Sequence, residues 1–215
     1  MTEKPIALEE RDESGARLFS PSAGRNKAVI AAELARLLPE GARVLGIASG
    51  TGEHAAELLG RREDVTWQPT DLDARSRASQ DDWARDFGGR MLRSRNVDVT
   101  IEGWWKGSAV DAVFCANMIH IAPWAAAEGL ARGAGGLLGE GGLMLLYGPF
   151  LKGTDSAKGN LRFDADLKRR DSRWGVRELA DVKGLFAKSG LSHVETASLP
   201  ANNDLLVFRK VAAPT

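Results

Sequence analysis

The sequence predicts an α/β fold in which helices cover both faces of a mostly parallel sheet. Short apolar segments that suit buried strands alternate with segments of helical periodicity along most of the chain. A glycine-rich turn follows the first clear strand and opens a helix. The chain ends in two strand-like segments joined by a short connection, and such a pair must add at least one antiparallel strand.

The first half of the chain is predicted to form three helices and three strands. In the first helix, apolar residues recur at helical spacing, Ser22 is the expected N-cap, and Pro39 and Gly41 end the helix. The third helix is polar, and the third strand has the weakest pattern. The predicted ranges are helices at 22–38, 53–59 and 75–87, and strands at 43–48, 65–68 and 91–99.

In the second half, the strand at 143–147 is apolar on both faces, which is typical of a central strand. The glycines at 139–142 are expected to end the helix before it, and Gly190 is expected to end the last helix. The polar segment 152–173 has few apolar anchors and is interpreted as a lid or loop. The other predicted elements are strands at 111–116, 192–198 and 204–210, and helices at 123–138 and 176–189.

The composition excludes several classes of protein. The 215 residues include 29 Lys and Arg and 29 Asp and Glu, so the formal net charge is zero. This balance gives no reason to expect nucleic acid or an anionic membrane as a partner. The single cysteine, Cys115, excludes an intrachain disulfide, and three scattered histidines give no metal-ligand spacing.

The sequence also predicts where the protein acts and how it is organised. Its start lacks the cationic residues and apolar run of a signal peptide, and its densest apolar run, 142–151, is too short to span a membrane. We therefore expect a cytoplasmic protein. Residues 1–20 are charged and irregular and are predicted to form a flexible arm, and residues 21–215 are predicted to form one domain, as a monomer or a homodimer.

The pattern G-x-G-x-x-[GA] occurs at residues 50–55, directly after a predicted strand and at the start of a helix. Asp71 follows 21 residues after Gly50, at the end of the next predicted strand. Gly50 and Gly52 permit a tight turn that a ligand can approach closely, and the acid can accept hydrogen bonds from both hydroxyls of a ribose. Together these features predict a cofactor that contains adenosine.

Two classes of cofactor fit this arrangement. A nicotinamide dinucleotide would place its pyrophosphate at the helix N-terminus, whereas S-adenosylmethionine has no phosphate. Glu53 lies in the first turn of the helix, where its negative charge would repel a pyrophosphate. The sequence therefore favours S-adenosylmethionine, with a nicotinamide-dependent oxidoreductase as the alternative.

Seven segments carry a resemblance to known proteins. They read SPSAGRNKAVI, IASGTGEHA, WQPTDLD, FCANMIHIAPW, LYGPF, FDADLKRRDSRWGVREL and LPANNDLLVFRK, between about Ser20 and Lys210. They resemble class I S-adenosylmethionine-dependent methyltransferases, and within that fold the methyltransferase-like twenty-six family, long labelled a domain of unknown function. The resemblance implies a Rossmann-like, mostly parallel sheet of seven strands with an antiparallel last strand. It also implies methyl transfer from S-adenosylmethionine to a small-molecule acceptor.

The resemblance implies a set of cofactor-binding residues. The glycine turn would face the methionyl part, Asp71 (with Asp73 as second choice) would hold the ribose, and Asp98 with Val99 would line the adenine. The residues after the fourth strand would flank the sulfonium. The implied set is Arg25, Asn26, Ala48, Gly50, Gly52, His54, Asp71, Asp98, Val99, Asn117 and Met118.

One position departs from the pattern of this fold, which is acid-x-G-x-G-x-G. Gly46 stands where the acid is expected, and Ala48 stands at the first glycine position. The acid normally supports binding of the cofactor's amino group, so its absence predicts weaker binding or an amino group held by other residues. It also leaves open a cofactor-binding protein that has lost the transfer or uses the cofactor for other chemistry.

His120 and Tyr147 are the predicted catalytic residues. His120 follows the fourth predicted strand, and an ordinary imidazole pKa suits a general base or a group that orients the acceptor. A pocket-lining histidine bonded to backbone is the competing interpretation. Tyr147 ends the fifth strand, where its hydroxyl could reach the same edge of the sheet. The predicted substrate-pocket residues are Trp124, Trp174 and Arg177, which offer aromatic walls and a guanidinium for a carboxylate.

Overall fold

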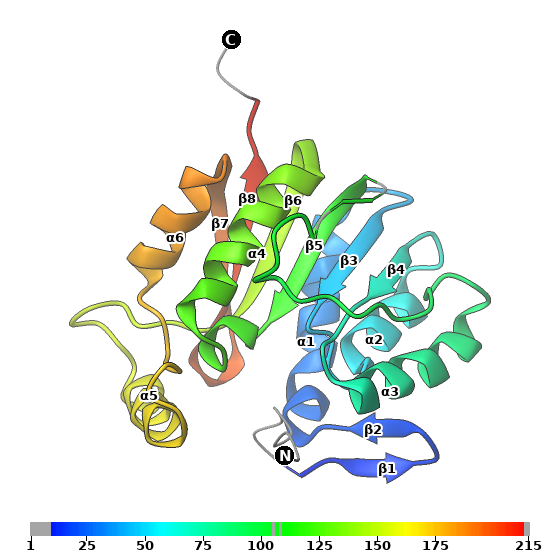
Figure 1. Cartoon of the computed structure of the whole chain (residues 1–215), viewed down its shortest axis with the longest axis horizontal. Coiled ribbons are helices and arrows are strands. Elements are labelled where there is room, and N and C mark those ends of the chain that lie inside the picture. Colours follow the sequence, from blue (N-terminus) through cyan, green and yellow to red (C-terminus); the bar gives the residue numbers. More distant parts are fainter. Residues whose placement is uncertain (1–9, 105, 108, 213–215) are drawn as a thin grey trace. The chain divides into compact units, whose positions relative to one another are not determined.

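The computed structural model describes residues 10–104, 106–107 and 109–212. These residues form two compact units that meet between Asp98 and Val99 in the sequence, and each unit is described by itself (Figure 1). The first nine residues of the predicted flexible arm lie outside the described residues. None of the helices in the described ranges combines the length and the apolar character that crossing a membrane requires.

The first unit contains two parallel strands, three helices and a hairpin. Its elements are β1 (Asp12–Ser14), β2 (Arg17–Phe19), α1 (Pro21–Leu37), β3 (Arg43–Ile47), α2 (Glu53–Arg61), β4 (Thr66–Pro69), α3 (Ala74–Ala84) and the 3-10 turn η1 (Arg85–Phe87). β3 pairs with β4 in parallel, with Val44 opposite Trp67. Both of these side chains are buried, as the apolar pattern predicts.

The N-cap of α1 lies two residues earlier than predicted. Its N-cap is Ser20, whose hydroxyl accepts a hydrogen bond from the backbone N–H of Ala23 at 3.3 Å. Pro21 occupies the first helical position, where its fixed φ suits the helix and its missing N–H costs no hydrogen bond. The prediction that Ser22 caps the helix was therefore wrong, because Pro21 starts the helix ahead of it.

The predicted third strand at 91–99 is present only as two isolated parallel bridges beside β4, at Met91 and Arg95. The backbone N–H of Leu92 donates to the carbonyl of Trp67, and that of Arg95 donates to Pro69. Between these points the side-chain amide of Gln68 donates to a backbone carbonyl of the segment, which interrupts the regular ladder. Apart from the β1–β2 pair, the described residues therefore contain six strands, β3 to β8, where seven were predicted.

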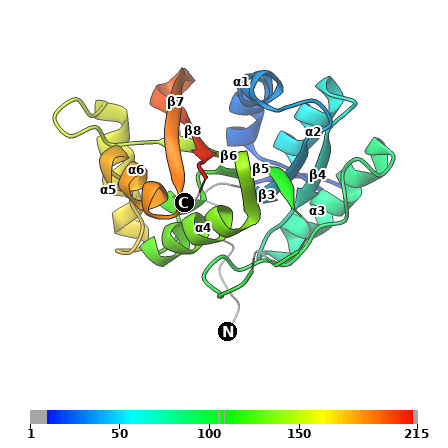
Figure 2. The same ribbon diagram turned by 90° about the horizontal axis from the view of Figure 1, so that it is seen from above.

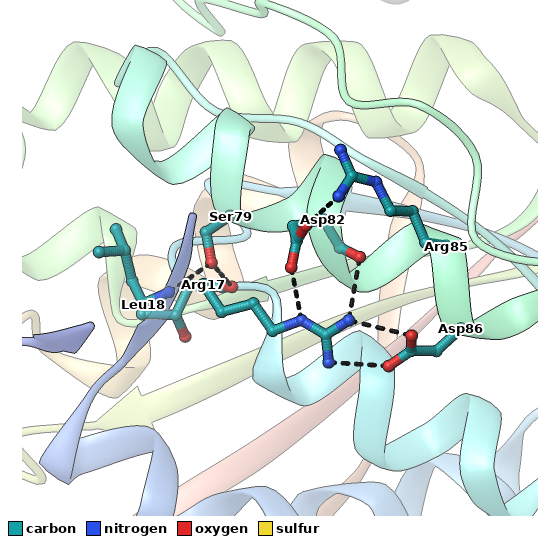
Figure 3. A network of polar contacts seen from close by, with 7 residues as sticks. Arg17, Leu18, Ser79, Asp82, Arg85 and Asp86 are labelled. Carbon is teal, nitrogen blue, oxygen red and sulfur yellow. Dashed lines mark hydrogen bonds and ion pairs between the residues drawn. The ribbon is translucent and has the colours of Figure 1, made fainter. Parts of the chain in front are cut away.

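Residues 12–19, predicted as part of an irregular arm, form the β1–β2 hairpin, which lies beside α3 in Figure 1. Figure 3 shows how Arg17 attaches the hairpin: its guanidinium donates to Asp82 at 2.7 Å and to both oxygens of Asp86 at 2.8 and 3.0 Å. The same guanidinium stacks 4.3 Å from the ring centroid of Trp83. These long-range contacts, which local sequence does not reveal, order the segment.

The second unit contains a four-stranded mixed sheet in the order β5-β6-β8-β7. Its elements are β5 (Val110–Ala116), η2 (Met118–His120), α4 (Trp124–Leu137), β6 (Leu138–Pro149), α5 (Lys158–Arg170), α6 (Leu179–Lys188), β7 (Leu191–Leu199), η3 (Pro200–Asn202) and β8 (Asn203–Lys210). β5 and β6 are parallel, and β8 is antiparallel to both β6 and β7. α4 and α6 pack side by side on one face of this sheet (Figures 1 and 2).

The segment interpreted as a lid or loop, 152–173, contains the 13-residue helix α5. This helix is polar almost all round, with Leu167 as its fully buried apolar anchor. Its surface carries ion pairs at helical spacing, such as Lys168 with Asp164 at 2.7 Å. The sequence prediction missed α5 because it relied on apolar periodicity, which a helix stabilised by such pairs does not show.

We expect Arg17→Lys to lower the free energy of unfolding by about 1 kcal/mol, because an ammonium cannot make the forked contacts or stack on Trp83. Urea denaturation measures this change. Arg93→Lys is the matched control, since Arg93 is 92% exposed and makes one pair at 3.4 Å. Equal effects of the two substitutions would contradict the role given to Arg17.

Candidate functional site

The glycine turn of the first unit connects β3 to α2 through left-handed backbone. Ala48, Gly50 and Gly52 have φ angles of 50°, 56° and 90°. Gly52 is the N-cap of α2, and a Cβ there would lie 3.1 Å from the Trp83 ring. Glycine is therefore needed at this position for both conformation and space. The turn exposes backbone at the carboxyl end of β3, which is where parallel α/β sheets bind ligands.

Asp71 closes this turn from the end of β4. Its carboxylate accepts hydrogen bonds from the backbone N–H of Gly50 at 2.8 Å and of Asp73 at 2.9 Å. Burial raises the pKa of Asp71 above its usual value, and the two backbone donors oppose this shift. Each carboxylate oxygen keeps lone pairs beyond these two bonds, so the group can still accept hydroxyl hydrogens.

The structure separates the two candidate ribose acids. Asp73 is the N-cap of α3, and its carboxylate accepts from the backbone N–H groups of Arg75 and Ser76 and from the Ser76 hydroxyl. Hydrogen bonds from Ser76 and Arg75 hold the pKa of Asp73 below its usual value, although burial opposes them. Because this carboxylate caps a helix, Asp71 is the better candidate for binding a ligand.

Glu53 is buried at the start of α2, where it ties several parts of the first unit together. Its carboxylate accepts from the backbone N–H of Ser20 at 2.8 Å and from the Thr51 hydroxyl at 2.9 Å, and it pairs with Lys27 at 3.0 Å. The negative charge is favourable at a helix N-terminus. The site where a dinucleotide would bind its pyrophosphate therefore already holds a carboxylate.

The RNK segment of α1 faces α2 with two of its three residues. Lys27 pairs with Glu53, and the amide oxygen of Asn26 lies 2.9 Å from Nε2 of His54. Burial and the charge of Lys27 lower the pKa of His54 to about 4, against the opposing effect of Glu53. Arg25 is exposed and donates to the Ser22 hydroxyl. Of the RNK segment, Asn26 and Lys27 therefore contact residues of α2.

The space beside Gly46 explains the departure from the acidic pattern. A Cβ at this position would lie 2.6 Å from the Ser49 hydroxyl oxygen and 2.6 Å from Nε1 of the Trp67 indole. Trp67 is fully buried, so it has little freedom to move. The indole therefore occupies the space that an acidic side chain would need, and the glycine and the tryptophan form a matched pair.

In the second unit, predicted site residues gather at the carboxyl end of β5. Asn117 has a left-handed φ of 60°, and its backbone N–H donates to the carbonyl of Tyr147 at 2.9 Å. Its own carbonyl accepts from the N–H of His120 at 3.0 Å, and Met118 begins the 3-10 turn η2 between them. Tyr147 is buried inside β6 rather than at its end, since β6 continues to Pro149.

His120 is a neutral imidazole with a fixed tautomer. Its Nδ1 accepts the backbone N–H of Arg177 at 3.4 Å, so the ring proton resides on Nε2. Burial, followed by the charge of Arg177, lowers the pKa of His120 to about 3, against the opposing effect of a backbone hydrogen bond with Gly175. A ring whose acceptor nitrogen is already bonded, and which resists protonation, is poorly suited to take a proton from a substrate. The structure therefore favours His120 as a hydrogen-bond donor over the predicted general base.

Arg177 holds the loop around His120 by its side chain as well. Its guanidinium donates to the carbonyls of Ile119 at 2.9 Å, Ala122 at 2.7 Å and Arg173 at 3.0 Å. It lies 5.5 Å from the ring centroid of Trp124, and both residues line a groove of about 650 Å³ beside α6. These contacts make Arg177 a structural clamp, with less donor capacity for a substrate carboxylate than predicted. Trp174 is not among the described residues that line the groove.

Two further features belong to the described part of the second unit. A cavity of about 400 Å³ lies where β6 ends and β8 begins, with Phe150, Asn160 and Asp204 among its walls. Sequence reasoning missed Asn160, whose buried amide donates to the carbonyls of Phe150 and Asn202. The signal that could have identified Asn160 is its place in α5, a helix that apolar periodicity did not reveal.

Val99 is buried, with its carbonyl against α4 at Gly129.

Asp98 is half-buried at the end of the first unit. Among the described residues, no group of three or more His, Cys, Asp or Glu is placed to hold a metal ion. Cys115 is buried within β5.

Solved methyltransferase structures share this α/β fold. An O-methyltransferase family protein from Burkholderia thailandensis is 19% identical, with a TM-score of 0.78, over 90% of this chain and 57% of that one. An O-methyltransferase family 2 protein from Planctomyces limnophilus DSM 3776, in complex with apigenin, is 18% identical, with a TM-score of 0.73, over 88% and 60%. Human N-acetylserotonin methyltransferase in complex with SAM is 14% identical, with a TM-score of 0.69, over 88% and 52%.

The chain thus spans 52–60% of the length of these structures. At such identities the likeness establishes the fold. A protein family described as "Protein of unknown function (DUF938)" matches residues 17–210 of the chain.

We expect Gly46→Ala to lower the free energy of unfolding by about 1–3 kcal/mol, because the added methyl group overlaps buried atoms of Trp67 and Ser49. Chemical denaturation measures this. Gly60→Ala in α2 is the control, since a Cβ there meets no atom within 4 Å and alanine favours the helix. A Gly46→Ala protein as stable as the wild type would show that Trp67 moves aside at little cost.

We expect the protein to lose stability as the pH falls below about 6.5. The folded-state pKa of His120, about 3, lies below the ordinary value of 6.5, so the unfolded chain binds more protons between these two values. His120 alone contributes a slope of up to about 1.4 kcal/mol per pH unit in that window. Unfolding free energies at pH 7.5 and 5 should differ less in His120→Gln than in the wild type. Identical differences in the two proteins would mean that His120 is protonated in the folded state.

Proposed function

The chain belongs to the family described as proteins of unknown function, DUF938, and for this member we propose methyl transfer from S-adenosylmethionine to a small-molecule acceptor. Its resemblance to the methyltransferase-like twenty-six family makes the same assignment. We further propose that it acts in the cytoplasm. When bound, the cofactor supplies an activated methyl group on a sulfonium, so the protein's contribution can be mainly proximity and orientation.

The observation that carries the proposal is the pair of carboxylates at the glycine turn. Asp71 presents oxygens with unused lone pairs at the end of β4, which suits the hydroxyls of a ribose. Glu53 places a buried negative charge at the start of α2, which opposes a pyrophosphate. An adenosine-containing cofactor without phosphates satisfies both conditions, and S-adenosylmethionine is such a cofactor. The same observation counts against a nicotinamide-dependent oxidoreductase.

The residues of the turn divide into two roles in this proposal. Ala48, Gly50 and Gly52 offer backbone to the methionyl part of the cofactor, because left-handed residues turn the chain without adding bulk. His54 and Asn26 flank the turn from α2 and α1. Lys27, which belongs to the same RNK segment as Asn26, pairs with the buried carboxylate of Glu53 at 3.0 Å.

In the second unit, Asn117, Met118 and His120 are the proposed residues on the acceptor side. Left-handed Asn117 and the 3-10 turn behind it hold these residues at the carboxyl end of β5. Tyr147 remains the second candidate for a proton acceptor, within β6.

Gly46 supports a second candidate function, a cofactor-binding protein without methyl transfer. The pair of Gly46 and Trp67 removes the acid that usually supports the cofactor's amino group in this fold. If the cofactor binds but no acceptor from a broad screen is methylated, this second function is the better description.

Calorimetric titration with S-adenosylmethionine, S-adenosylhomocysteine and NAD tests the proposal. We expect both sulfur compounds to bind, and Asp71→Asn to weaken them at least about tenfold by removing a charged acceptor for the ribose. Asp73→Asn is the matched control, because asparagine caps a helix as well as aspartate and the group is already occupied.

Binding of NAD alone would transfer the assignment to the oxidoreductase. Equal losses in Asp71→Asn and Asp73→Asn would contradict the specific role of Asp71.

A further inference from the structure

The buried ring of His120 presents a hydrogen-bond donor that the protein does not use. Only 1% of this residue is exposed. Because Nδ1 accepts the backbone N–H of Arg177, the neutral ring carries its proton on Nε2. Nε2 is closed off from solvent and has no hydrogen-bond partner among the described residues. A buried N–H without a partner costs free energy, so an unpaired donor of this kind indicates a role.

The second unit holds this donor in place by several contacts to the Gly175–Arg177 segment. The backbone N–H of Gly175 donates to the carbonyl of His120 at 2.9 Å, and that of Arg177 donates to the ring. The edge of the imidazole packs against Phe150, with the ring centroids 5.3 Å apart at 72°. These contacts fix the position of the ring, and Nε2 takes part in none of these hydrogen bonds.

Gly148 lies directly beside Nε2. A Cβ at Gly148 would lie 2.5 Å from Nε2 and 3.3 Å from Oδ1 of Asn117, so glycine keeps this corner clear of a side chain. Arg177 supplies a nearby positive charge that acts on the His120 ring. Asp164, which accepts from the backbone N–H of Val176 and pairs with Lys168, partly offsets the charge of Arg177. A neutral N–H donor beside a guanidinium suits an oxygen with negative charge.

We propose that His120 donates its Nε2–H to an anionic oxygen of the methyl acceptor, which is therefore a small molecule with a carboxylate or an acidic hydroxyl. This inference rests on the proposed function, because only a methyltransferase has a methyl acceptor. The binding of an anionic oxygen at His120 is argued from residues of the second unit alone. His120 thus orients the acceptor and stabilises its deprotonated form. The acceptor gives up its proton to solvent on binding, and His120 takes no proton.

Nuclear magnetic resonance of protein labelled with ¹⁵N histidine tests this directly. Long-range ¹H–¹⁵N spectra identify which nitrogen of each ring carries the proton, and the His120→Gln spectrum assigns His120 among the three histidines. We expect the Nε2–H tautomer of His120 at pH 7. On titration with benzoate, the Nε2–H resonance should move and saturate, whereas benzamide, which is uncharged, should move it much less.

Four substitutions, one of them a control, complete the test. Gly148→Ala fills the corner beside Nε2, and His120→Phe removes the donor; each should weaken benzoate binding at least about tenfold. His120→Gln keeps an N–H donor and should bind within a few fold of the wild type. Gly184→Ala is the control in the same unit, since a Cβ there meets no atom within 4 Å. Calorimetry measures the binding of benzoate to each variant, and circular dichroism confirms that each variant folds.

Three results would overturn the inference: an Nδ1–H tautomer, no benzoate shift beyond that of benzamide, or a bound water that stays on Nε2–H at saturating benzoate. The wild-type spectra decide these points even if a variant fails to fold. Because the benzoate titration contains no cofactor, its failure is distinct from failure of the proposed function, which the titration with S-adenosylmethionine reports.

Discussion

The buried carboxylate of Glu53 connects the start of α1, the glycine turn and the start of α2, and the rest of the first unit is arranged around it. It accepts from the backbone of Ser20, where α1 is capped, and from the hydroxyl of Thr51 within the turn. Lys27 pairs with it at 3.0 Å, which compensates for the burial of the carboxylate. The hairpin adds a second brace: the N–H of Leu18 donates to Ser79, whose hydroxyl donates to the carbonyl of Thr51 (Figure 3). A turn rich in glycine is thereby held in one conformation.

The second unit uses the same principle with different groups. Its site residues lie on a short 3-10 turn after β5, which has little stability of its own. The Gly175–Arg177 segment supplies what the turn lacks, because its backbone and the Arg177 guanidinium bond to the carbonyls and the ring of that turn. The same packing has a chemical consequence, because burial of the ring, followed by the charge of Arg177, lowers the pKa of His120. Position and protonation state are therefore set together.

Apolar pattern located the buried strands well, since β3, β5 and the core of β6 lie where the sequence predicts them. It failed where stability comes from polar contacts. α5 was missed because ion pairs and one buried leucine hold it, and the β1–β2 hairpin was missed because Arg17 attaches it to residues more than 60 positions away. α4 ends at Leu137, just before the glycines at 139–142 as expected, but β6 begins at Leu138 instead of Leu143 and includes these glycines. Glycine interrupts periodicity in both elements, so its presence alone did not distinguish them.

The sequence by itself determined the α/β class, the glycine turn with Asp71 at its correct spacing, and the departure at Gly46. These follow from local properties: apolar alternation, the conformational freedom of glycine, and the length of a strand–helix–strand unit. The tertiary structure alone decided that Trp67 fills the place of the missing acid, that Lys27 pairs with Glu53 beside the turn, and that Nδ1 of His120 accepts a backbone hydrogen bond. Each of these depends on which distant group lies within hydrogen-bonding or packing distance. A side chain's protonation, partner and available space are properties of its surroundings, and local sequence does not contain them.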